Sequence, residues 1–115
     1  MSNSVITSMS NVLYIDLTNE TSKVVQRQDL YDKYLGGTGV ATQLLHEEFT
    51  EIKDALDSEA PIVLSIGPFS GIYPCCTKAV AMFRSPLTGE LGESYAGGRI
   101  ATVMRFAGYD SIVIT

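Results

Sequence analysis

The side chains that could carry out chemistry in this sequence are few. The two cysteines, Cys75 and Cys76, are adjacent, and neighbouring cysteines seldom reach the geometry of a relaxed disulfide. Because no histidine or cationic pattern surrounds them, we expect inert loop residues and neither metal ligands nor redox sensors. The only histidine, His46, has no second ligand in a metal-binding pattern and makes a poor metal site. Glu90 and Glu93 could act as an acid–base pair, but on a glycine-rich segment they are more typical of solvated carboxylates.

Glycines stand out more than any reactive side chain. Residues 85–98, SPLTGELGESYAGG, contain Gly89, Gly92, Gly97 and Gly98 and almost no bulky apolar side chain. Glycine loses more conformational freedom on folding than any other residue. A glycine-dense folded segment therefore indicates sharp bends or a close approach of the backbone to another group. The alternative, that these glycines serve only turns and helix packing, stays open at this point.

The composition indicates one folded domain. The chain has 115 residues, of which 45% are hydrophobic and 18% are charged, as expected for a globular protein. A formal net charge of −5 and the lack of a Lys/Arg cluster argue against a nucleic-acid partner. Residues 1–10 have no cationic start and no long apolar stretch, so we interpret them as a flexible tail and not as a signal peptide. No run of 18 apolar residues is present, and we expect a cytoplasmic protein without a membrane segment.

The first part of the chain predicts a hairpin followed by two helices. Residues 12–17 and 22–26 are rich in β-formers and are separated by a four-residue turn. Asp29 is placed to cap a short helix that runs through Leu35. A second helix has one apolar face, formed by Val40, Leu44, Leu45 and Phe49.

The second part of the chain predicts two strands, a helix and a last strand. Residues 61–66 form a compact apolar run that is typical of a central strand, and residues 78–84 form the next strand. Residues 85–96 are interpreted as turn and loop. Gly97-Gly98 then open a helix with an apolar face formed by Ile100, Val103, Met104 and Ala107. Gly108 ends this helix, and residues 111–115 form the final strand.

This order of elements predicts an α+β domain over residues 11–115. Two strands, two helices, two strands, a helix and a strand follow one another along the chain. Such a mixed order favours a mixed, largely antiparallel sheet with helices packed on it.

Four motifs in this order resemble the opening part of one enzyme family. They are GPFSG at 67–71, SPLTG at 85–89, the triplet Ala96-Gly97-Gly98, and FAGYDSIVI at 106–114. Upstream, VLYIDLT and KYLGGTG look like the same family's first hairpin and helix turn. From about Val12 to Thr115 the chain resembles the first half of the N-terminal domain of the aldehyde ferredoxin oxidoreductases. Several motifs in register are a more specific signal than one glycine pattern.

The resemblance implies a bis-pterin cofactor, tungstopterin or molybdopterin, on a saddle formed by the N-terminal domain. The cofactor-binding residues that it implies are Cys76, Thr77, Lys78, Tyr95, Ala96, Gly97 and Gly98. Lys78 stands where the family has an arginine that hydrogen-bonds the pterin, so the charge is kept but the planar two-point contact is lost. Tyr95 stands where the family usually has asparagine. In the family, the backbone carbonyl at that position binds the magnesium ion that bridges the pterin phosphates, so the resemblance implies Tyr95 as the metal ligand.

The same resemblance implies a cofactor-binding domain or subunit of an oxidoreductase that acts on aldehydes with ferredoxin as electron acceptor. In the family, later domains supply the cysteines of a four-iron cluster and most of the substrate pocket. Two adjacent cysteines cannot provide four thiolates, so we expect this chain to hold no iron–sulfur cluster and to be inactive alone. The alternative is a stand-alone remnant of the fold without cofactor, which serves as a structural or interaction protein.

The partner expected from the sequence is a protein. The resemblance covers the first of two similar halves of the family's N-terminal domain. We therefore expect a homodimer, in which a second copy replaces the other half, or a separate catalytic subunit that carries the remaining domains.

Overall fold

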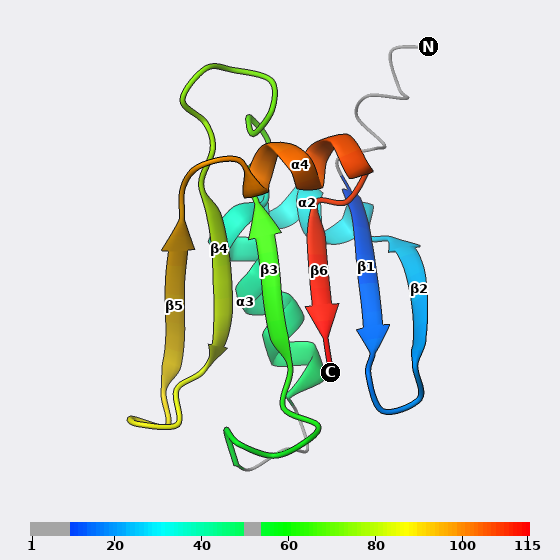
Figure 1. The fold of residues 1–115 in the computed structure, drawn as a ribbon, viewed down its shortest axis with the longest axis vertical. Coiled ribbons are helices and arrows are strands. Elements are labelled where there is room, and N and C mark those ends of the chain that lie inside the picture. Colours follow the sequence, from blue (N-terminus) through cyan, green and yellow to red (C-terminus); the bar gives the residue numbers. More distant parts are fainter. Residues whose placement is uncertain (1–9, 50–53) are drawn as a thin grey trace.

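The computed structural model describes residues 10–49 and 54–115, which form a six-stranded sheet with helices on both faces (Figure 1). The strands are β1 (Asn11–Asp16), β2 (Thr21–Gln26), β3 (Ile62–Ile66), β4 (Ala79–Arg84), β5 (Leu91–Ala96) and β6 (Ser111–Ile114). The helices are α2 (Gln28–Tyr34), α3 (Gly37–Glu48) and α4 (Ile100–Ala107). The strand order is β2-β1-β6-β3-β4-β5, and β1 and β6 form the parallel pair while the other pairs are antiparallel. The predicted α+β class with a largely antiparallel sheet is confirmed.

The predicted hairpin and the second helix are also confirmed. β1 and β2 pair along their whole length, and Asp16 Oδ1 accepts hydrogen bonds from the backbone N–H groups of Thr18 and Asn19 in the turn. Helix α3 buries the predicted apolar face, with Phe49 partly buried beside it. This face packs on Val63, Met82 and other core residues from the middle of the sheet.

The prediction that Asp29 caps the first helix is wrong. Arg27 occupies the position before α2, and no side chain caps this helix end. Asp29 lies in the first turn and accepts hydrogen bonds from Arg27 Nε at 3.2 Å and Nη2 at 3.3 Å. Arg27 also donates to the Tyr14 hydroxyl and to Glu47. The Asp29 carboxylate, which was expected to accept hydrogen bonds from the helix backbone, thus binds the Arg27 guanidinium group instead.

The glycine-rich stretch contains a strand that the sequence did not predict. Residues 85–90 form a hairpin turn, in which Ser85 N–H donates to the Glu90 carbonyl and Gly89 N–H donates to the Ser85 carbonyl, both at 2.8 Å. The chain then continues as β5, which pairs with β4 over its whole length. Most β5 side chains are exposed because the strand forms one edge of the sheet, so the sequence shows no alternation of apolar and polar residues there.

The N-terminal side of the described domain includes Ser10. This residue is buried, and its carbonyl accepts a hydrogen bond from Arg27 N–H at 2.8 Å. Residues 1–9 of the predicted tail lie outside the described residues. None of the described helices combines the length and the apolar character that crossing a membrane requires.

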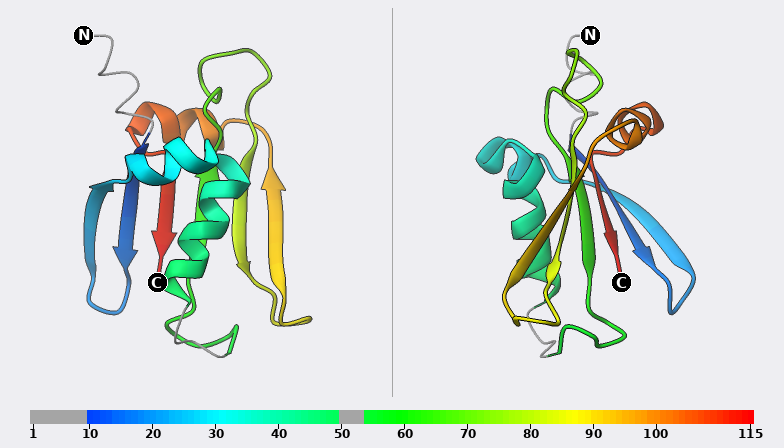
Figure 2. Two further views of the ribbon diagram at one scale, coloured as in Figure 1. Left: turned by 180° about the vertical axis from the view of Figure 1, so that it is seen from behind. Right: turned by 60° about the vertical axis from the view of Figure 1, so that its left-hand side comes forward.

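The helices cover the two faces of the sheet unequally. α2 and α3 lie on one face, and α4 lies on the other face at the end where β3 and β5 finish (Figures 1 and 2). Helix α4 packs on Ile66 and Ala79 through Ala101 and Met104.

The prediction for the buried face of α4 is therefore partly wrong. Met104 is buried as predicted, but Ile100 and Val103 are 42% and 55% exposed, and Ala107 is exposed as well. Ala101, which was not assigned to the buried face, is fully buried. The periodicity of IATVMRFA places the apolar face opposite Arg105, but in the structure Arg105 faces inward, because Asp110 and two backbone carbonyl groups give its charge partners there.

Candidate functional site

Two of the predicted site segments meet at one end of the sheet. The antiparallel pairing of β4 and β5 sets Ala79 opposite Ala96, so the residues before β4 lie beside those after β5. The Lys78 side chain lies over Gly97, because a Cβ atom built on Gly97 would be 3.2 Å from Lys78 Nζ. We call this group, Lys78 with Ala96, Gly97 and Gly98, the Lys78 corner. It lies at the same end of the sheet as α4 (Figure 1).

The Lys78 corner is accessible from solvent. Lys78 and residues 95–98 are exposed, while Cys76 and Thr77 are half-buried just before β4. Tyr95 precedes the corner on β5, and its hydroxyl donates to Glu93 Oε2 at 3.0 Å, which raises the pKa of Tyr95. The predicted role of Tyr95 concerns its backbone carbonyl and stays a prediction.

The charges and backbone groups near the corner suit an anion. Arg99 follows Gly98 directly, is exposed and occupies the position before α4 without capping it by a side-chain hydrogen bond. The first N–H groups of a helix have no partner within the helix, and this end carries the positive end of the helix dipole. Two cationic side chains, Lys78 and Arg99, and a helix N-terminus therefore gather near the same exposed glycine pair.

For three of the four glycines in residues 85–98, turn geometry or packing within the fold explains why the residue is glycine. Gly89 and Gly98 have φ angles of +76° and +86°, a region that other residues rarely adopt. Gly92 faces Phe83 across the hairpin, and a Cβ atom on Gly92 would be 2.5 Å from the ring.

Gly97 differs from these glycines. Its φ lies outside the left-handed region, and among the described residues a Cβ atom at this position would come within 4 Å only of the flexible end of Lys78. Turn geometry and packing thus account for Gly89, Gly92 and Gly98, whereas the fold itself does not require a glycine at position 97.

Metal-binding side chains do not cluster in the part of the chain that the structure describes. Within residues 10–49 and 54–115, no three His, Cys, Asp or Glu side chains come together in a group that could hold a metal ion. Cys75 is exposed and Cys76 is half-buried, and both are free thiols. A metal ion at the Lys78 corner would therefore take its ligands from a cofactor or from backbone carbonyl groups.

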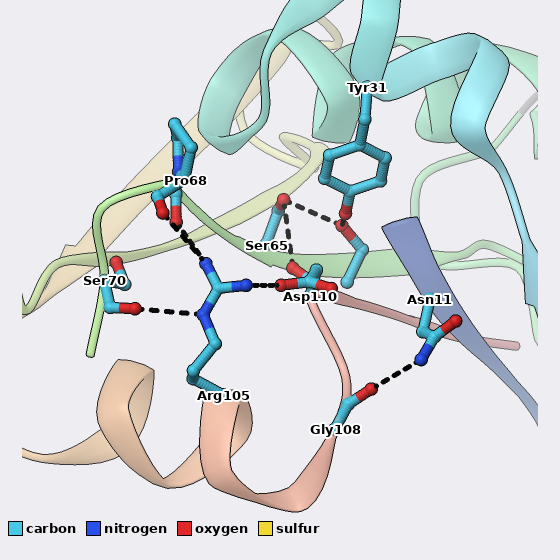
Figure 3. A network of polar contacts seen from close by, with 10 residues as sticks. Asn11, Tyr31, Ser65, Pro68, Ser70, Arg105, Gly108 and Asp110 are labelled. Carbon is cyan, nitrogen blue, oxygen red and sulfur yellow. Dashed lines mark hydrogen bonds and ion pairs between the residues drawn. The ribbon is translucent and has the colours of Figure 1, made fainter. Parts of the chain in front are cut away.

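A buried ion pair fixes the beginning of the loop that leads to the Lys78 corner (Figure 3). Arg105 of α4 pairs through Nη1 with Oδ1 of Asp110, which lies just before β6. Arg105 Nε donates to the Ser70 carbonyl at 2.9 Å, and Nη2 donates to the Gly67 carbonyl at 2.8 Å. The two paired side chains are only 11% and 2% exposed. One guanidinium group thus joins α4, the start of β6 and the loop after β3, and we call this arrangement the Arg105 clamp.

Burial controls the ionisation of the groups around the clamp. It raises the pKa of Asp110 to about 6, against the opposing effect of the Arg105 charge. Asp110 Oδ2 is buried and has no hydrogen-bond partner among the described residues. Beside the clamp, Ser111 shares hydrogen bonds with the Tyr31 hydroxyl at 2.5 Å and with the Ser65 hydroxyl at 2.8 Å. These contacts join α2, β3 and β6 in a polar network beside the Arg105 clamp.

The model of the aldehyde ferredoxin oxidoreductase N-terminal domain matches residues 12–115 of this chain. The chain belongs to the aldehyde ferredoxin oxidoreductase family. A tungsten-containing aldehyde ferredoxin oxidoreductase of Pyrococcus furiosus is 34% identical over 88 residues, which are 76% of this chain and 14% of that protein. The WOR-like subunit of an aliphatic sulfonate oxidoreductase from the same organism is 31% identical over 107 residues, or 90% of this chain and 17% of that subunit.

A solved structure of similar fold extends the comparison. A chain of the active site complex BamBC of benzoyl-coenzyme A reductase, bound to 1,5-dienoyl-CoA, aligns with a TM-score of 0.82 and 25% identity. The alignment covers 92% of this chain and 16% of that one. This chain thus spans between 14% and 17% of the length of these relatives.

The motifs that resemble the family have different roles in the structure. GPFSG and FAGYD meet in the Arg105 clamp, SPLTG forms the hairpin turn, and the Ala-Gly-Gly triplet forms the Lys78 corner. Sequence reasoning missed Arg105, Asp110 and Arg99. The sequence signal for the clamp was one basic and one acidic residue, Arg105 and Asp110, which lie five positions apart in an otherwise uncharged segment.

Proposed function

We propose that this chain is the cofactor-binding N-terminal part of a tungsten or molybdenum oxidoreductase, and that the Lys78 corner binds a phosphate group of the pterin cofactor. The single observation that carries this proposal is Gly97. It is exposed beneath a lysine side chain, and neither turn geometry nor packing requires a glycine there. An anionic ligand can approach the backbone closely where no side chain blocks it and where a cation lies beside it. The names of the relatives, which are tungsten-containing enzymes, support the class of cofactor.

The residues of the corner fit such a group. Lys78 supplies a mobile positive charge, Gly97 leaves room that a Cβ atom would fill, and the N–H groups at the start of α4 are available as donors. Cys76 and Thr77 border the corner, and the Tyr95 carbonyl would be the ligand for a magnesium ion between phosphates. When bound, the cofactor would supply metal-centred redox chemistry, while these residues would hold and orient it.

Oxidation of aldehydes with ferredoxin as acceptor would need further polypeptide. The relatives are about six times longer than the matched segment, and the part of the chain described here has no cluster of metal-binding side chains. We propose that a separate catalytic subunit or the remaining sequence of a longer enzyme supplies the substrate pocket and the iron–sulfur cluster. The competing proposal is a structural or interaction protein that has lost the cofactor.

The test is the cofactor content of the protein purified from cells that make tungstopterin and receive tungstate. Tungsten and molybdenum are measured by mass spectrometry, and pterin by fluorescence after oxidation. We expect metal and pterin in the wild type and a loss of about tenfold or more in Lys78→Met, because the cation that faces the phosphate is removed. Lys33→Met removes the same charge from an exposed position on α2 and serves as the control.

Equal cofactor content in Lys78→Met and Lys33→Met would contradict the assigned site. A wild-type protein without metal and pterin would contradict the function and favour the structural alternative.

A further inference from the structure

The loop between β3 and β4 carries both cysteines of the chain on one tight turn. This loop extends beyond the end of the sheet (Figure 1). The Cys76 N–H group donates a hydrogen bond to the Tyr73 carbonyl at 3.4 Å, which closes a four-residue turn over residues 73–76. Pro74 occupies the second position of this turn, and Cys75 occupies the third with a φ of +66°. A proline followed by a residue of positive φ is the pattern of a type II turn.

Cys75 stands at the turn position that glycine suits best. The third residue of a type II turn needs a positive φ, so glycine or asparagine is usual there. In the part of the chain that the structure describes, Cys75 shares a positive φ with only two other non-glycine residues, Glu20 and Leu35. Packing gives no reason for a cysteine, because Cys75 is exposed. An exposed residue in an unfavourable backbone conformation indicates a role for its side chain.

Two adjacent thiols can hold one atom between them more easily than they can bond to each other. Consecutive Cα atoms are about 3.8 Å apart, whereas the Cα atoms of a relaxed disulfide are about 4.4–6.8 Å apart. A direct bond between the two sulfur atoms would therefore be strained. An atom placed between them adds two bonds of about 2.3 Å, the length of a zinc–sulfur bond, and closes a larger and less strained ring.

We propose that Cys75 and Cys76 form a dithiol site that binds one trivalent organic arsenical. Both thiols are free, Cys75 is exposed and Cys76 is half-buried, so a small molecule can reach the pair. Within residues 10–49 and 54–115, no three His, Cys, Asp or Glu side chains form a metal-binding group, so the bound atom has two protein ligands. Zinc needs four ligands, whereas arsenic in this class needs two, because carbon takes its third position. This inference goes beyond the proposed function and does not depend on cofactor binding.

The binding step exchanges one oxygen atom for two sulfur atoms. In an arsenical of the form R–As=O, two arsenic–sulfur bonds form and the arsenic–oxygen bond breaks. The two thiol protons leave with the oxygen as water. Arsenic stays trivalent and sulfur keeps its oxidation state, so the step needs no oxidant or reductant. The second arsenic–sulfur bond forms within one chain, which strengthens binding without any further contact.

The test is a titration of the reduced, cofactor-free chain with phenylarsine oxide. We expect one phenylarsenic group per chain by intact mass, and both thiols should become unreactive toward a thiol reagent. An excess of mercaptoethanol should leave the group bound, whereas dimercaptopropanol, itself a dithiol, should remove it. Cys75→Ser and Cys76→Ser should each lower the affinity by about a hundredfold or more, because only one sulfur atom remains.

The matched control keeps two thiols in the chain and separates them. Cys75→Ser combined with Leu87→Cys moves one thiol to the hairpin turn, where Leu87 is 92% exposed. This variant should bind phenylarsine oxide as weakly as Cys75→Ser does. Equal affinity in the wild type and in this control would overturn the proposal. A wild type that does not bind, that loses the group to mercaptoethanol, or that binds it between two chains would overturn it as well.

Cys75→Gly separates the role of the thiol from that of the turn. Glycine suits a positive φ, so the midpoint of urea unfolding should be no lower than in the wild type. The affinity for phenylarsine oxide should nevertheless fall by about a hundredfold or more. Retention of the wild-type affinity in Cys75→Gly would contradict a site built from both thiols. Cys76→Ser decides the question if Cys75→Gly fails to fold.

Discussion

Replacement of Arg105 by alanine should remove much of the stability of this domain. The guanidinium group makes three close hydrogen bonds, to the Gly67 and Ser70 carbonyls and to the Asp110 carboxylate, and its side chain is 11% exposed. Hydrogen bonds that involve a charged group contribute about 1.5–3 kcal/mol each. Since Arg105→Ala also leaves a buried carboxylate without its partner, we expect a loss of about 3–5 kcal/mol at neutral pH. A domain of this size has about 5–15 kcal/mol in total, so the variant should be marginal.

Urea unfolding followed by circular dichroism measures this loss, provided that the dependence of the unfolding free energy on urea concentration stays unchanged. Arg99→Ala, at an exposed position on the N-terminal side of the same helix, is the control and should change the unfolding free energy by less than about 0.5 kcal/mol. In Arg105→Ala the Asp110 carboxyl group can escape its unpaired charge by binding a proton. The loss should therefore be smaller at about pH 5 than at about pH 7.5. A loss below about 1 kcal/mol, or one that does not depend on pH, would refute the assignment of Arg105 as the residue that holds the loop.

Two further predictions concern a glycine and a carboxyl group. Gly92→Ala should destabilise the domain by about 1–3 kcal/mol, because its Cβ atom would be 2.5 Å from the Phe83 ring. Gly97→Ala should reduce the unfolding free energy by less than about 0.5 kcal/mol, and equal losses for the two variants in urea unfolding would contradict this difference. The pKa of Asp110 is raised from 3.8 to about 6 in the folded protein, so its contribution to stability is fully present below about pH 3.8 and is lost as the pH rises through about 6. Relative to Asp110→Asn, the wild type should therefore lose stability between about pH 4 and pH 7, and a constant difference across this range would show that the pKa is not raised.

The sequence predicted most elements because their signals are local. The hairpin of β1 and β2, the apolar face of α3 and the central strand β3 each contain the periodicity that their burial requires. Strand β5 was not predicted because an exposed edge strand needs no alternation of apolar and polar residues. Its glycine, Gly92, is explained only by the Phe83 ring on the neighbouring strand.

The site was predictable in part. Family motifs indicated Lys78 and Gly97, and the register of β4 and β5 brings these two residues together. The Arg105 clamp could not be derived in the same way, because its two carbonyl acceptors, Ser70 and Gly67, lie 35 and 38 residues upstream, in a loop whose position depends on the finished sheet. The buried side of α4 was predicted wrongly because periodicity places Arg105 in solvent, whereas the clamp gives this charge partners inside the domain.

The most direct test of the proposed function is cofactor retention in a protein with a side chain at position 97. Gly97→Val should leave the unfolding free energy within about 0.5–1 kcal/mol of the wild type, because only the flexible end of Lys78 must move. It should nevertheless reduce bound pterin and tungsten by about tenfold or more, since the added methyl groups would occupy the space for the ligand. Ser58→Val adds similar bulk to an exposed turn before β3, at the opposite end of the sheet, and should retain the wild-type content. Equal pterin and tungsten content in Gly97→Val, Ser58→Val and the wild type would contradict the Lys78 corner as the cofactor site.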